Sequence, residues 1–522
     1  MSTRPAADTE VLIVGAGPTG LSMACQLQRH GVGFVIVDQA EGLTPYSKAI
    51  GVQARTLEIY EQLGLAEPAL AQGSIARRGR LVVGGQVRGE IDLSDIGRGL
   101  SAYPYVLMLE QSKNERLLHD HLQAGGGAVS WQTTLVGLDH GADDASAELR
   151  QADGTTQTLR ARYVVGCDGP HSTVRHALGL GFVGSTFERT FYVADARIDW
   201  ALPHDALHIC FSDDAFVVFF PLEGERRYRI VGVVPQRLEE RDGEWGFEAI
   251  ETRIAGETGI DLAIHDVEWF STYKVHTRHA EHFSDGCAFI AGDAAHVHTP
   301  AGAQGMNTGI QDGYNLAWKL AWVLKGRADP RLLASYDEER LANARHLLST
   351  TDRLFEFTAG TTWWLGFLRS RVLPPIAGRL FKFGPVRSFV FPLLSQTGIS
   401  YRDASLSQHD GDADFAVRAG DRMPYFALDG GSVYDRLREP RFQLLTFSDA
   451  VADGVRLHAL AAEFAGGLSV QALPLDTTVR RSFGSQRPFC ALLRPDNHLA
   501  LLSHDTSGEP ARAYLADLAR PA

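Results

Sequence analysis

The sequence predicts a mixed α/β protein in which a mainly parallel sheet is interrupted by an antiparallel one. Three observations support this fold class. An apolar strand, a glycine turn, a helix and a second strand form a βαβ unit over residues 11–38. Apolar and polar residues alternate between about 182 and 273, which is typical of antiparallel strands. A short apolar strand at 287–293 then returns the chain to the first sheet.

The glycine turn has the sequence GAGPTG at positions 15–20, and each glycine has its own physical reason. Gly15 permits the tight turn, Gly17 lets the backbone approach a pyrophosphate, and Gly20 lets the helix pack on the strand. The N-terminus of the helix offers N–H groups and the positive end of its dipole to a diphosphate. Asp38 ends the second strand, where a carboxylate can accept hydrogen bonds from a ribose. These features together predict a Rossmann-like dinucleotide site rather than a glycine turn without a ligand.

Composition limits the function and the location. A chain of 522 residues is too long for one core, so we expect two or three domains. The net charge of −13 argues against non-specific binding of nucleic acid. Five scattered cysteines without a CxxC pair indicate a reducing, cytoplasmic environment and no zinc site. Residues 1–10 do not resemble a signal peptide, and no apolar run is long enough to span a membrane.

Several elements follow the βαβ unit. A turn-rich loop at 39–51 leads into a helix at about 53–63, which ends at Gly64. Two short strands are expected within residues 80–94, and a further helix begins near Ser112, the predicted N-cap, with Glu115 three residues later. Lys48 and Arg55 are the notable cations of this region, either as ligands of an anion or as solvated surface charges.

The next segment completes both sheets. A strand at 129–131 and a hairpin around Asp153 precede a buried strand that ends at Gly169. After the antiparallel region, the strand at 287–293 runs into a loop of small residues and a helix at 308–324. The positive end of that helix is expected beneath a flat ligand. His296 and His298 lie in the loop without further spaced ligands, so we predict no metal.

Three motifs in this order carry a resemblance to a known family. GAGPTG at 15–20, Cys167-Asp168-Gly169 and Gly292-Asp293 resemble the fingerprints of the single-component, group A FAD-dependent aromatic hydroxylases. The resemblance covers nearly the whole chain and implies FAD as cofactor, with NADPH or NADH as a transient co-substrate. It also implies that reduced flavin and molecular oxygen form a C4a-hydroperoxide, which hydroxylates an aromatic, phenolic or polyketide-like small molecule.

The resemblance further implies roles for individual residues. Asp293 binds the ribityl chain, Asp168 supports FAD and the pyridine nucleotide, and Gln111 lies near the flavin. The full expected cofactor-binding set is Gly15, Gly17, Pro18, Thr19, Gly20, Asp38, Gln39, Lys48, Ala49, Arg55, Gln111, Leu135, Asp168, Asp293, Pro300, Gly305, Met306 and Asn307. The expected catalytic set is Arg55, Pro300, Gly305 and Tyr192.

The chain departs from the family at three positions. Lys48 stands where arginine is usual, and Ala303 stands where glycine is common. Ile50 replaces an aspartate that helps phenol-hydroxylase relatives to deprotonate the substrate. The alternatives for that step are Tyr192, His208, His276 or a bound water. Aromatic residues within 354–395 form either helical core or part of a substrate wall; they are Phe355, Phe357, Trp363, Trp364, Phe367, Phe381, Phe383, Phe389 and Phe391.

The expected domains are an FAD-binding unit at 1–180 and 276–350, a substrate-binding sheet at 181–275, a helical connection at 351–399 and a thioredoxin-like unit at 400–522. The last lacks CxxC, so we expect a structural or oligomer-forming role, such as a homodimer contact. Two alternatives to hydroxylation are open. One is a Baeyer–Villiger or antibiotic-modifying monooxygenase on the same fold, and the other is a flavin-binding protein without catalysis.

Overall fold

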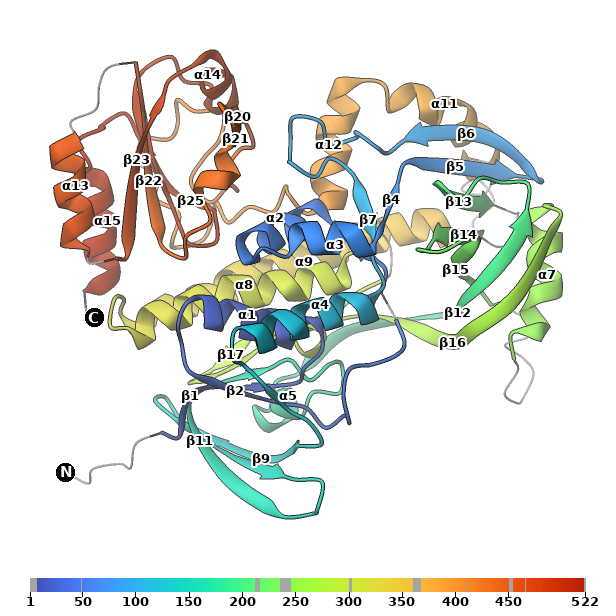
Figure 1. Cartoon of the computed structure of the whole chain (residues 1–522), viewed down its shortest axis with the longest axis horizontal. Helices are drawn as coiled ribbons and strands as arrows, with labels where there is room; N and C mark the ends of the chain where they lie inside the picture. The colour runs from blue at the N-terminus through green and yellow to red at the C-terminus, as the bar shows by residue number, and fades with distance from the viewer. Residues whose placement is uncertain are drawn as a thin grey trace.

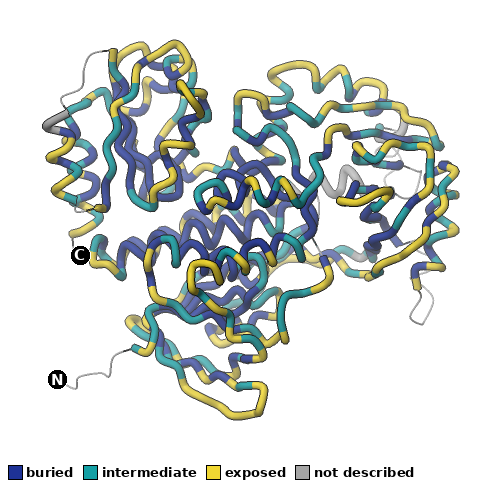
Figure 2. The backbone as a smooth tube through the Cα atoms, in the orientation of Figure 1, coloured by how far each residue is buried: buried dark blue, intermediate teal, exposed yellow. Residues whose placement is uncertain are grey.

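The three largest of five sheets are arranged around one long buried helix in the described part of the computed structural model (Figure 1). The structure describes residues 7–47, 49–211, 216–234, 246–299, 303–359, 368–409, 411–449, 454–464 and 466–520. Helix α8 (Gly305–Leu324) crosses the middle of the molecule, and almost all of its residues are buried (Figure 2). The fold class predicted from the sequence is confirmed.

The first sheet contains the βαβ unit and has the order β17-β18-β11-β1-β2-β8, extended by β9 and β10. Strand β1 pairs in parallel with β2 and β11, and β11 pairs in parallel with β18. The carboxyl ends of these four strands therefore meet at one edge of the sheet. The strands are β1 (Thr9–Val14), β2 (Phe34–Val37), β8 (Val129–Ser130), β9 (Thr134–His140), β10 (Ala145–Arg150), β11 (Thr156–Gly166), β17 (Ser284–Asp285) and β18 (Ala288–Ile290).

Helices and short elements cover this sheet. Helix α1 packs against both α4 and α8. The elements are α1 (Pro18–Arg29), β3 (Gly51–Val52), α2 (Ala54–Leu63), α3 (Ala66–Gln72), β4 (Ser74–Ala76), β7 (Val106–Met108), α4 (Gln111–Ala124), α5 (Thr173–Ala177), η1 (Gly292–Ala294), β19 (His296–Val297), η2 (Pro330–Leu333) and α9 (Ala334–Ala359). No helix within the described ranges has the length and apolar composition needed to cross a membrane.

The second sheet is mostly antiparallel, as predicted, with the order β19-β16-β12-β15-β14-β13-β5-β6. The hairpin β5–β6 joins it through parallel pairing of β5 with β13, although the expected boundary at residue 180 groups that hairpin with the first unit. Helix α7 covers one face of the sheet with apolar side chains. The strands and helix are β5 (Arg78–Val83), β6 (Gln86–Asp92), β12 (Phe182–Trp200), β13 (Ala206–Phe211), β14 (Phe216–Pro221), β15 (Arg227–Val233), α7 (Glu248–Thr258) and β16 (Leu262–Ala280).

The C-terminal unit is a thioredoxin-like sheet with the order β23-β22-β24-β25 and helices α13 and α15 on one side (Figure 1). Its one cysteine, Cys490, is a buried free thiol. The elements are β20 (Ala427–Leu428), β21 (Gly431–Ser432), η4 (Val433–Arg436), β22 (Phe442–Ser448), α13 (Gly454–Glu463), β23 (Leu468–Pro474), α14 (Thr477–Phe483), β24 (Phe489–Leu493), β25 (Leu499–Ser503) and α15 (Glu509–Ala519).

A helical connection precedes the C-terminal unit and contains η3 (Leu368–Val372), α11 (Leu373–Leu380) and α12 (Gly384–Ser395). Phe391 is buried with its ring against Gly97, whereas Phe383 and Phe389 are 62% and 75% exposed. The aromatic residues of this segment are therefore not one continuous core. The side chains of Phe355, Phe357, Trp363, Trp364 and Phe367 lie outside the described part of the structure.

Two predicted helix ends need correction. Ser112 is not an N-cap, because α4 begins at Gln111 and its N-cap is Glu110; the Ser112 hydroxyl instead lies 2.9 Å from that of Ser47. Helix α8 begins at residue 305, three residues earlier than predicted. By contrast, the predicted end of α2 at Gly64 is confirmed by a left-handed φ of 73°.

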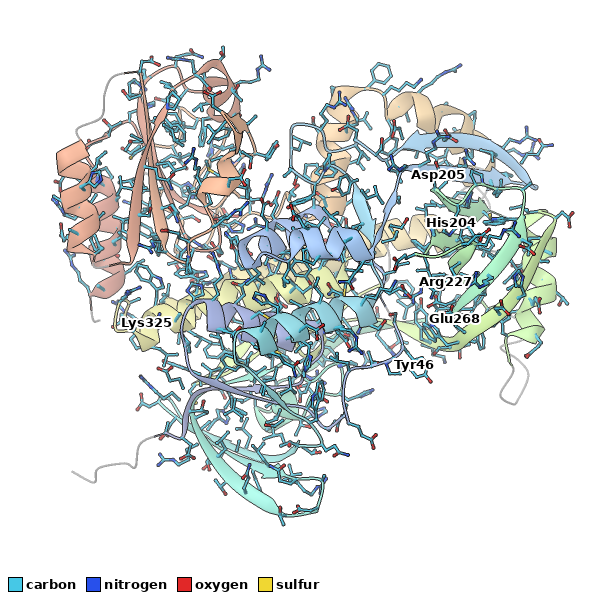
Figure 3. The ribbon with its side chains drawn as sticks, in the orientation of Figure 1. Tyr46, His204, Asp205, Arg227, Glu268 and Lys325 are labelled. Carbon is cyan, nitrogen blue, oxygen red and sulfur yellow. The ribbon has the colours of Figure 1, made fainter. Side chains whose placement is uncertain are left out.

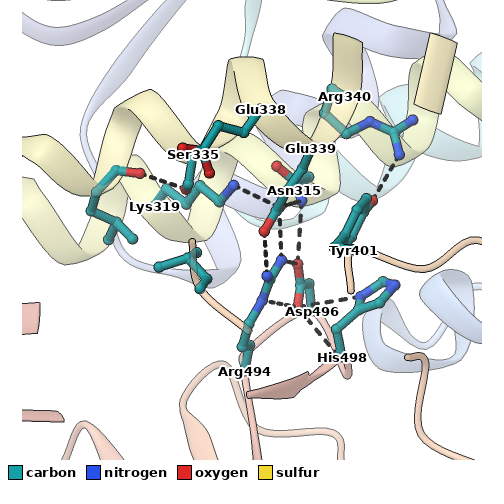
Figure 4. A network of polar contacts seen from close by, with 12 residues as sticks. Asn315, Lys319, Ser335, Glu338, Glu339, Arg340, Tyr401, Arg494, Asp496 and His498 are labelled. Atoms are coloured by element: carbon teal, nitrogen blue, oxygen red, sulfur yellow. Dashed lines mark hydrogen bonds and ion pairs between the residues drawn. The ribbon is translucent and has the colours of Figure 1, made fainter. Parts of the chain in front are cut away.

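Buried ions attach the C-terminal unit to α8 and α9 (Figure 4). The Arg494 guanidinium contacts both carboxylate oxygens of Glu339 and also pairs with Asp496. Lys319 donates to Glu339 at 2.8 Å, and all four side chains are essentially inaccessible to solvent. Charges buried away from solvent are stable only when they are paired. This network therefore requires the C-terminal unit to be docked against α8 and α9.

Glu339→Gln should test the network. Burial alone would raise the pKa of Glu339, but Arg494 and Lys319 outweigh it and lower the pKa from 4.5 to about 2. A depressed folded-state pKa means that this stabilisation is complete above pH 4.5 and is lost as pH falls towards about 2. At neutral pH, Glu339→Gln should lower the free energy of unfolding by about 3–5 kcal/mol, because buried cations lose their partner. It should also flatten the acid-dependent loss of stability.

The measurement is urea unfolding followed at several pH values. Glu463→Gln is the matched control, because Glu463 forms a half-exposed ion pair with Arg512. The control should change stability by less than about 1 kcal/mol. Equal effects of the two variants would contradict a dominant role for the buried network.

Candidate active site

The three sequence motifs meet at the carboxyl edge of the first sheet. Gly15 has a φ of 102°, and a Cβ there would lie 2.4 Å from the carbonyl oxygen of Cys167. A Cβ on Gly20 would lie 1.9 Å from the carbonyl oxygen of Gly15. A Cβ on Gly292 would lie 2.4 Å from Thr19 Oγ1, so the first and third motifs are in close contact. The steric reasons predicted for Gly15 and Gly20 are therefore confirmed.

Gly17 differs from its two neighbours in the motif. Its φ of −73° and ψ of −174° are open to any residue, and a Cβ there would meet no atom within 4 Å. The fold therefore does not need glycine here. The open space faces the first turn of α1, where Pro18 occupies N1 and N–H groups are left without helical acceptors. This arrangement fits the diphosphate of a dinucleotide such as FAD.

Two carboxylates, Asp38 after β2 and Asp293 after β18, follow parallel strands of the first sheet, with β11 and β1 between those strands. Asp38 accepts from the N–H groups of Ala16, at 2.6 Å, and Ala40, at 2.8 Å. These contacts orient the carboxylate and leave further lone pairs for a ligand, because a carboxylate offers about four acceptor sites. Asp293 lies in η1 directly after β18 and is exposed. Gln39, next to Asp38, is also exposed.

Asp168 already has partners within the protein. It accepts from Ser172 Oγ and from the N–H of Thr173, both at 2.6 Å, and from the N–H of Val174 at 3.2 Å. Burial raises the pKa of Asp168 above its ordinary value, although these hydrogen bonds act in the opposite direction. The visible role of Asp168 is therefore to hold the turn that begins α5.

The N-terminus of α8 lies beside the loop that was predicted to contact a flat ligand. Gly305, Met306 and Asn307 form its first turn, where backbone N–H groups have no helical acceptors. The Asn307 side chain is fully used: its oxygen accepts from Gln53 N and Thr56 Oγ1, and its nitrogen donates to the carbonyls of Gly51 and Ala303. Asn307 thus ties the start of α2 to α8. Pro300 lies outside the described residues.

Ala303 precedes this helix in a left-handed conformation with a φ of 53°. Glycine adopts this region freely, whereas alanine there costs about 1–2 kcal/mol. Alanine at this position therefore carries a backbone strain that glycine would not. His298 faces the same helix start, since a Cβ on Gly305 would lie 3.5 Å from its Nε2. Burial lowers the pKa of His298 to about 4, so its ring is neutral at neutral pH.

Gln111 of α4 and Arg229 of the second sheet hold the loop that contains Ala49. Gln111 makes two hydrogen bonds to the Ala49 backbone, and Arg229 Nη1 donates to the Ala49 carbonyl at 3.0 Å. Arg229 forms a two-point, fully buried ion pair with Asp195, which also accepts from the Trp269 indole at 2.7 Å. We did not identify Arg229 or Asp195 from the sequence. The sequence does contain a signal for them, because each is a charged residue within a strand of otherwise mostly apolar residues. Lys48 lies outside the described residues.

Asp312 is a third residue that we did not identify from the sequence. Its buried carboxylate accepts from the Gly292 N–H at 2.9 Å, from Arg340 Nε at 2.6 Å and pairs with His296 Nε2 at 2.7 Å. Burial would raise the pKa of Asp312, but Arg340 and His296 outweigh it and lower the pKa. Asp312 therefore anchors the Gly292-Asp293 turn to α8, and His296 is engaged as its partner.

Several expected site residues lie elsewhere. Arg55 is buried in an ion pair with Glu58 and donates to the carbonyl of Asp496, so its guanidinium contacts the C-terminal unit. An FAD diphosphate could reach it only after these contacts break. Leu135 is buried in the apolar core, where β9 pairs with β10.

Tyr192 is not on the side of the sheet that contacts the Ala49 loop. Successive residues of a strand point to opposite faces, and Asp195 points towards that loop. Tyr192 instead packs with the apolar residues beneath α7. Its hydroxyl is buried, abuts Gly232 and has no hydrogen-bond partner among the described residues. The predicted catalytic placement of Tyr192 is thus corrected to a core position. Figure 3 shows this sheet at the right, with Arg227 and Glu268 labelled.

Comparison with known proteins gives consistent matches over the whole chain. Residues 8–351 match the FAD binding domain family. The chain is 33% identical to a flavin-dependent monooxygenase of Mycobacteroides abscessus, over 97% of this chain and 99% of the relative. It is 32% identical to 6-methylpretetramide 4-monooxygenase of Streptomyces rimosus, over 95% and 91%. It resembles the solved ternary complex of aklavinone-11 hydroxylase with FAD and aklavinone, at 25% identity and a TM-score of 0.80, over 99% and 100%.

Gly17→Ala should separate ligand binding from folding. Because its Cβ would enter open space, the variant should keep its free energy of unfolding within about 1 kcal/mol of wild type. The methyl group should nevertheless obstruct the diphosphate and weaken FAD binding by about tenfold or more. Gly20→Ala is the steric contrast and should fail to fold normally. FAD content and urea midpoints report both effects, and unchanged FAD affinity in Gly17→Ala would contradict this placement.

Tyr192→Phe should leave NAD(P)H oxidation and its coupling to product unchanged. It removes a buried hydroxyl that lacks a partner, so the free energy of unfolding should rise by about 1 kcal/mol. The matched control is Tyr60→Phe, because the equally buried Tyr60 hydroxyl donates to Asn114 at 2.7 Å. That variant should lose about 1 kcal/mol in the same urea titration. If Tyr192→Phe consumed NAD(P)H without forming product, the core placement would be contradicted and Tyr192 would be assigned to the substrate site.

Proposed function

This chain belongs to the family of FAD-dependent aromatic monooxygenases, and from that premise we propose that it hydroxylates a fused-ring, polyketide-like phenol with molecular oxygen. The activity class is an NAD(P)H-consuming hydroxylation of an aromatic small molecule. The observation that carries the proposal is the meeting of the three motifs beside the N-terminus of α8 and the loop held by the second sheet. Relatives named for 6-methylpretetramide and aklavinone support the choice of a fused-ring substrate.

Bound FAD supplies hydride acceptance and oxygen activation. In our proposal, Gly17, Thr19 and the start of α1 hold its diphosphate, Asp38 its ribose and Asp293 its ribityl chain. Ala49, Gln111 and the first turn of α8 lie against the ring system. Pro300 and Lys48 keep the roles expected from the sequence. Arg229 acts as a positioning residue, since it reaches the cofactor only through the Ala49 carbonyl.

The apolar surroundings of Ile50 also support the proposed substrate class, because they leave no carboxylate at this position to deprotonate a phenol. Ile50 is 5% exposed and packs with Ala76, Met108 and Leu222, so a carboxylate at this position would be buried among apolar groups. Of the other groups considered for deprotonation, Tyr192 lies beneath α7. His208 is buried, bonds to the Pro203 carbonyl and has its pKa lowered by burial to about 4.

His276, the third group considered, is exposed and bonds to Thr186. A bound water is then the route that we propose. This route suits a phenol already made acidic by a neighbouring carbonyl, as in fused polyketide rings, better than a simple phenol.

Location and assembly are part of the same proposal. We propose a cytoplasmic enzyme, supported by five free cysteines. A homodimer is proposed on the basis of the exposed apolar residues Phe383 and Phe389 on the helical connection.

The test compares substrates on the FAD-loaded protein. Fused-ring phenols that carry a carbonyl beside the hydroxyl should accelerate NAD(P)H oxidation by about tenfold or more over simple phenols. Mass spectrometry should show one added oxygen as a new phenol. A lactone or an opened ring would indicate Baeyer–Villiger chemistry instead. Preference for simple phenols would contradict the proposed substrate class.

A further inference from the structure

A cavity of about 350 Å³ lies where the C-terminal unit meets the ends of α1 and α8. Lys325, labelled in Figure 3, marks this end of α8. Small-molecule sites often form at such boundaries, and this volume is at the lower end of their range. The lining residues are Gln28, Arg29, His30, Gly31, Ala321, Trp322, Lys325, Arg327, Pro440, Arg441 and Gly466.

The lining of this cavity carries four cationic side chains and no acidic one. They are Arg29 and Lys325 from the helix ends, Arg327 from the segment after α8, and Arg441 directly before β22. Two carboxylates act on the cluster from outside the lining. Glu439 pairs with Arg441 at 2.9 Å, and the charge of Glu10 partly offsets the lowering of the Lys325 pKa by burial and Arg327. Positive charge is thus concentrated here, although the whole chain has a net charge of −13.

Stabilisation of helix dipoles explains only part of this cluster. Cations at helix C-termini are favourable, and Lys325 donates to the His30 carbonyl at the end of α1. Arg327 and Arg441 lie outside the helices, so the dipole argument does not reach them. His30 reports their combined field, because burial first and then Arg29, Lys325 and Arg327 lower its pKa well below the ordinary value. The cationic side chains around the cavity repel one another, and a bound anion would reduce that repulsion.

Trp322 contributes an aromatic side chain to the lining of the cavity. Its side chain is 3% exposed and packs edge-on against Phe442, with ring centroids 4.7 Å apart. Within the described part of the chain, its indole N–H is buried and has no acceptor.

We infer that this cavity binds a phosphate-bearing small molecule, held by Arg29, Lys325 and Arg327 from one unit and Arg441 from the other. The site is separate from hydride transfer. The 20 residues of α8 span about 30 Å, and the three motifs lie at its opposite end. A ligand here contacts both units, so its binding stabilises their docking.

The experiment is calorimetric titration of the FAD-loaded protein with inorganic pyrophosphate and, separately, with ADP. Both should bind saturably, raise the melting temperature and bind more weakly at higher salt. Tighter binding of ADP than of pyrophosphate would assign a nucleoside phosphate, and equal binding would assign recognition of the phosphates alone. Uncharged adenosine should not bind. FAD loading keeps the dinucleotide site filled.

Charge-removing variants locate the binding. Arg441→Gln should weaken pyrophosphate binding by about tenfold. Lys325→Gln, on the other wall, should do the same and serves if Arg441→Gln folds poorly. The matched control is Arg487→Gln, an exposed arginine of the same unit that pairs with Asp414. Absence of saturable binding, or equal weakening by Arg487→Gln and Arg441→Gln, would overturn the inference.

Discussion

One buried carboxylate, that of Asp312, holds together the parts on which the site depends. It accepts the Gly292 N–H, pairs with His296 and binds Arg340, all without contact with solvent. A buried charge of this kind is stable only while each partner stays in place. Asp312 therefore fixes the turn that carries Asp293 against the helix whose N-terminus faces the proposed flavin. The position of the Gly292-Asp293 turn is therefore set by Asp312 of α8 and Arg340 of α9.

The same chain of contacts continues into the C-terminal unit. Arg340 donates to the Tyr401 hydroxyl at 2.8 Å, and the Tyr401 ring lies 4.5 Å from that of His498. Beside them, Arg494 links Asp496 to Glu339. The C-terminal unit has no redox pair of cysteines, yet its ions complete the interior of the first unit. These ions join the C-terminal unit to α8 and α9, and the boundary between the units also contains the cationic cavity.

The second sheet has two faces with different purposes. On one face, the ion pair of Asp195 and Arg229 reaches the Ala49 carbonyl and so fixes a loop of the first unit. On the other face, Tyr192 and its apolar neighbours form a core with α7. Because strand residues alternate between faces, a difference of one position decides whether a side chain faces the Ala49 loop or lies in the core beneath α7. The paired charges, which are costly to bury, mark the face that supports the site.

The sequence by itself determined the features that depend on neighbours along the chain. The spacing of Gly15, Gly17 and Gly20, the strand before Asp38 and the apolar strand before Asp293 predicted a Rossmann-like sheet with a dinucleotide site. The resemblance of the three motifs to a known family then implied FAD as the dinucleotide. These are local because a strand, a turn and a helix start lie within a few residues of one another.

Tertiary structure alone decided the placements that join distant segments. Arg55 contacts Asp496, which is 441 residues away, and Tyr192 faces α7 rather than the Ala49 loop. Hairpin β5–β6 belongs to the second sheet, and the cationic cavity combines the ends of α1 and α8 with Arg441. Periodicity predicts that a strand has two faces, but the element that covers each face is chosen by packing between segments far apart in the chain.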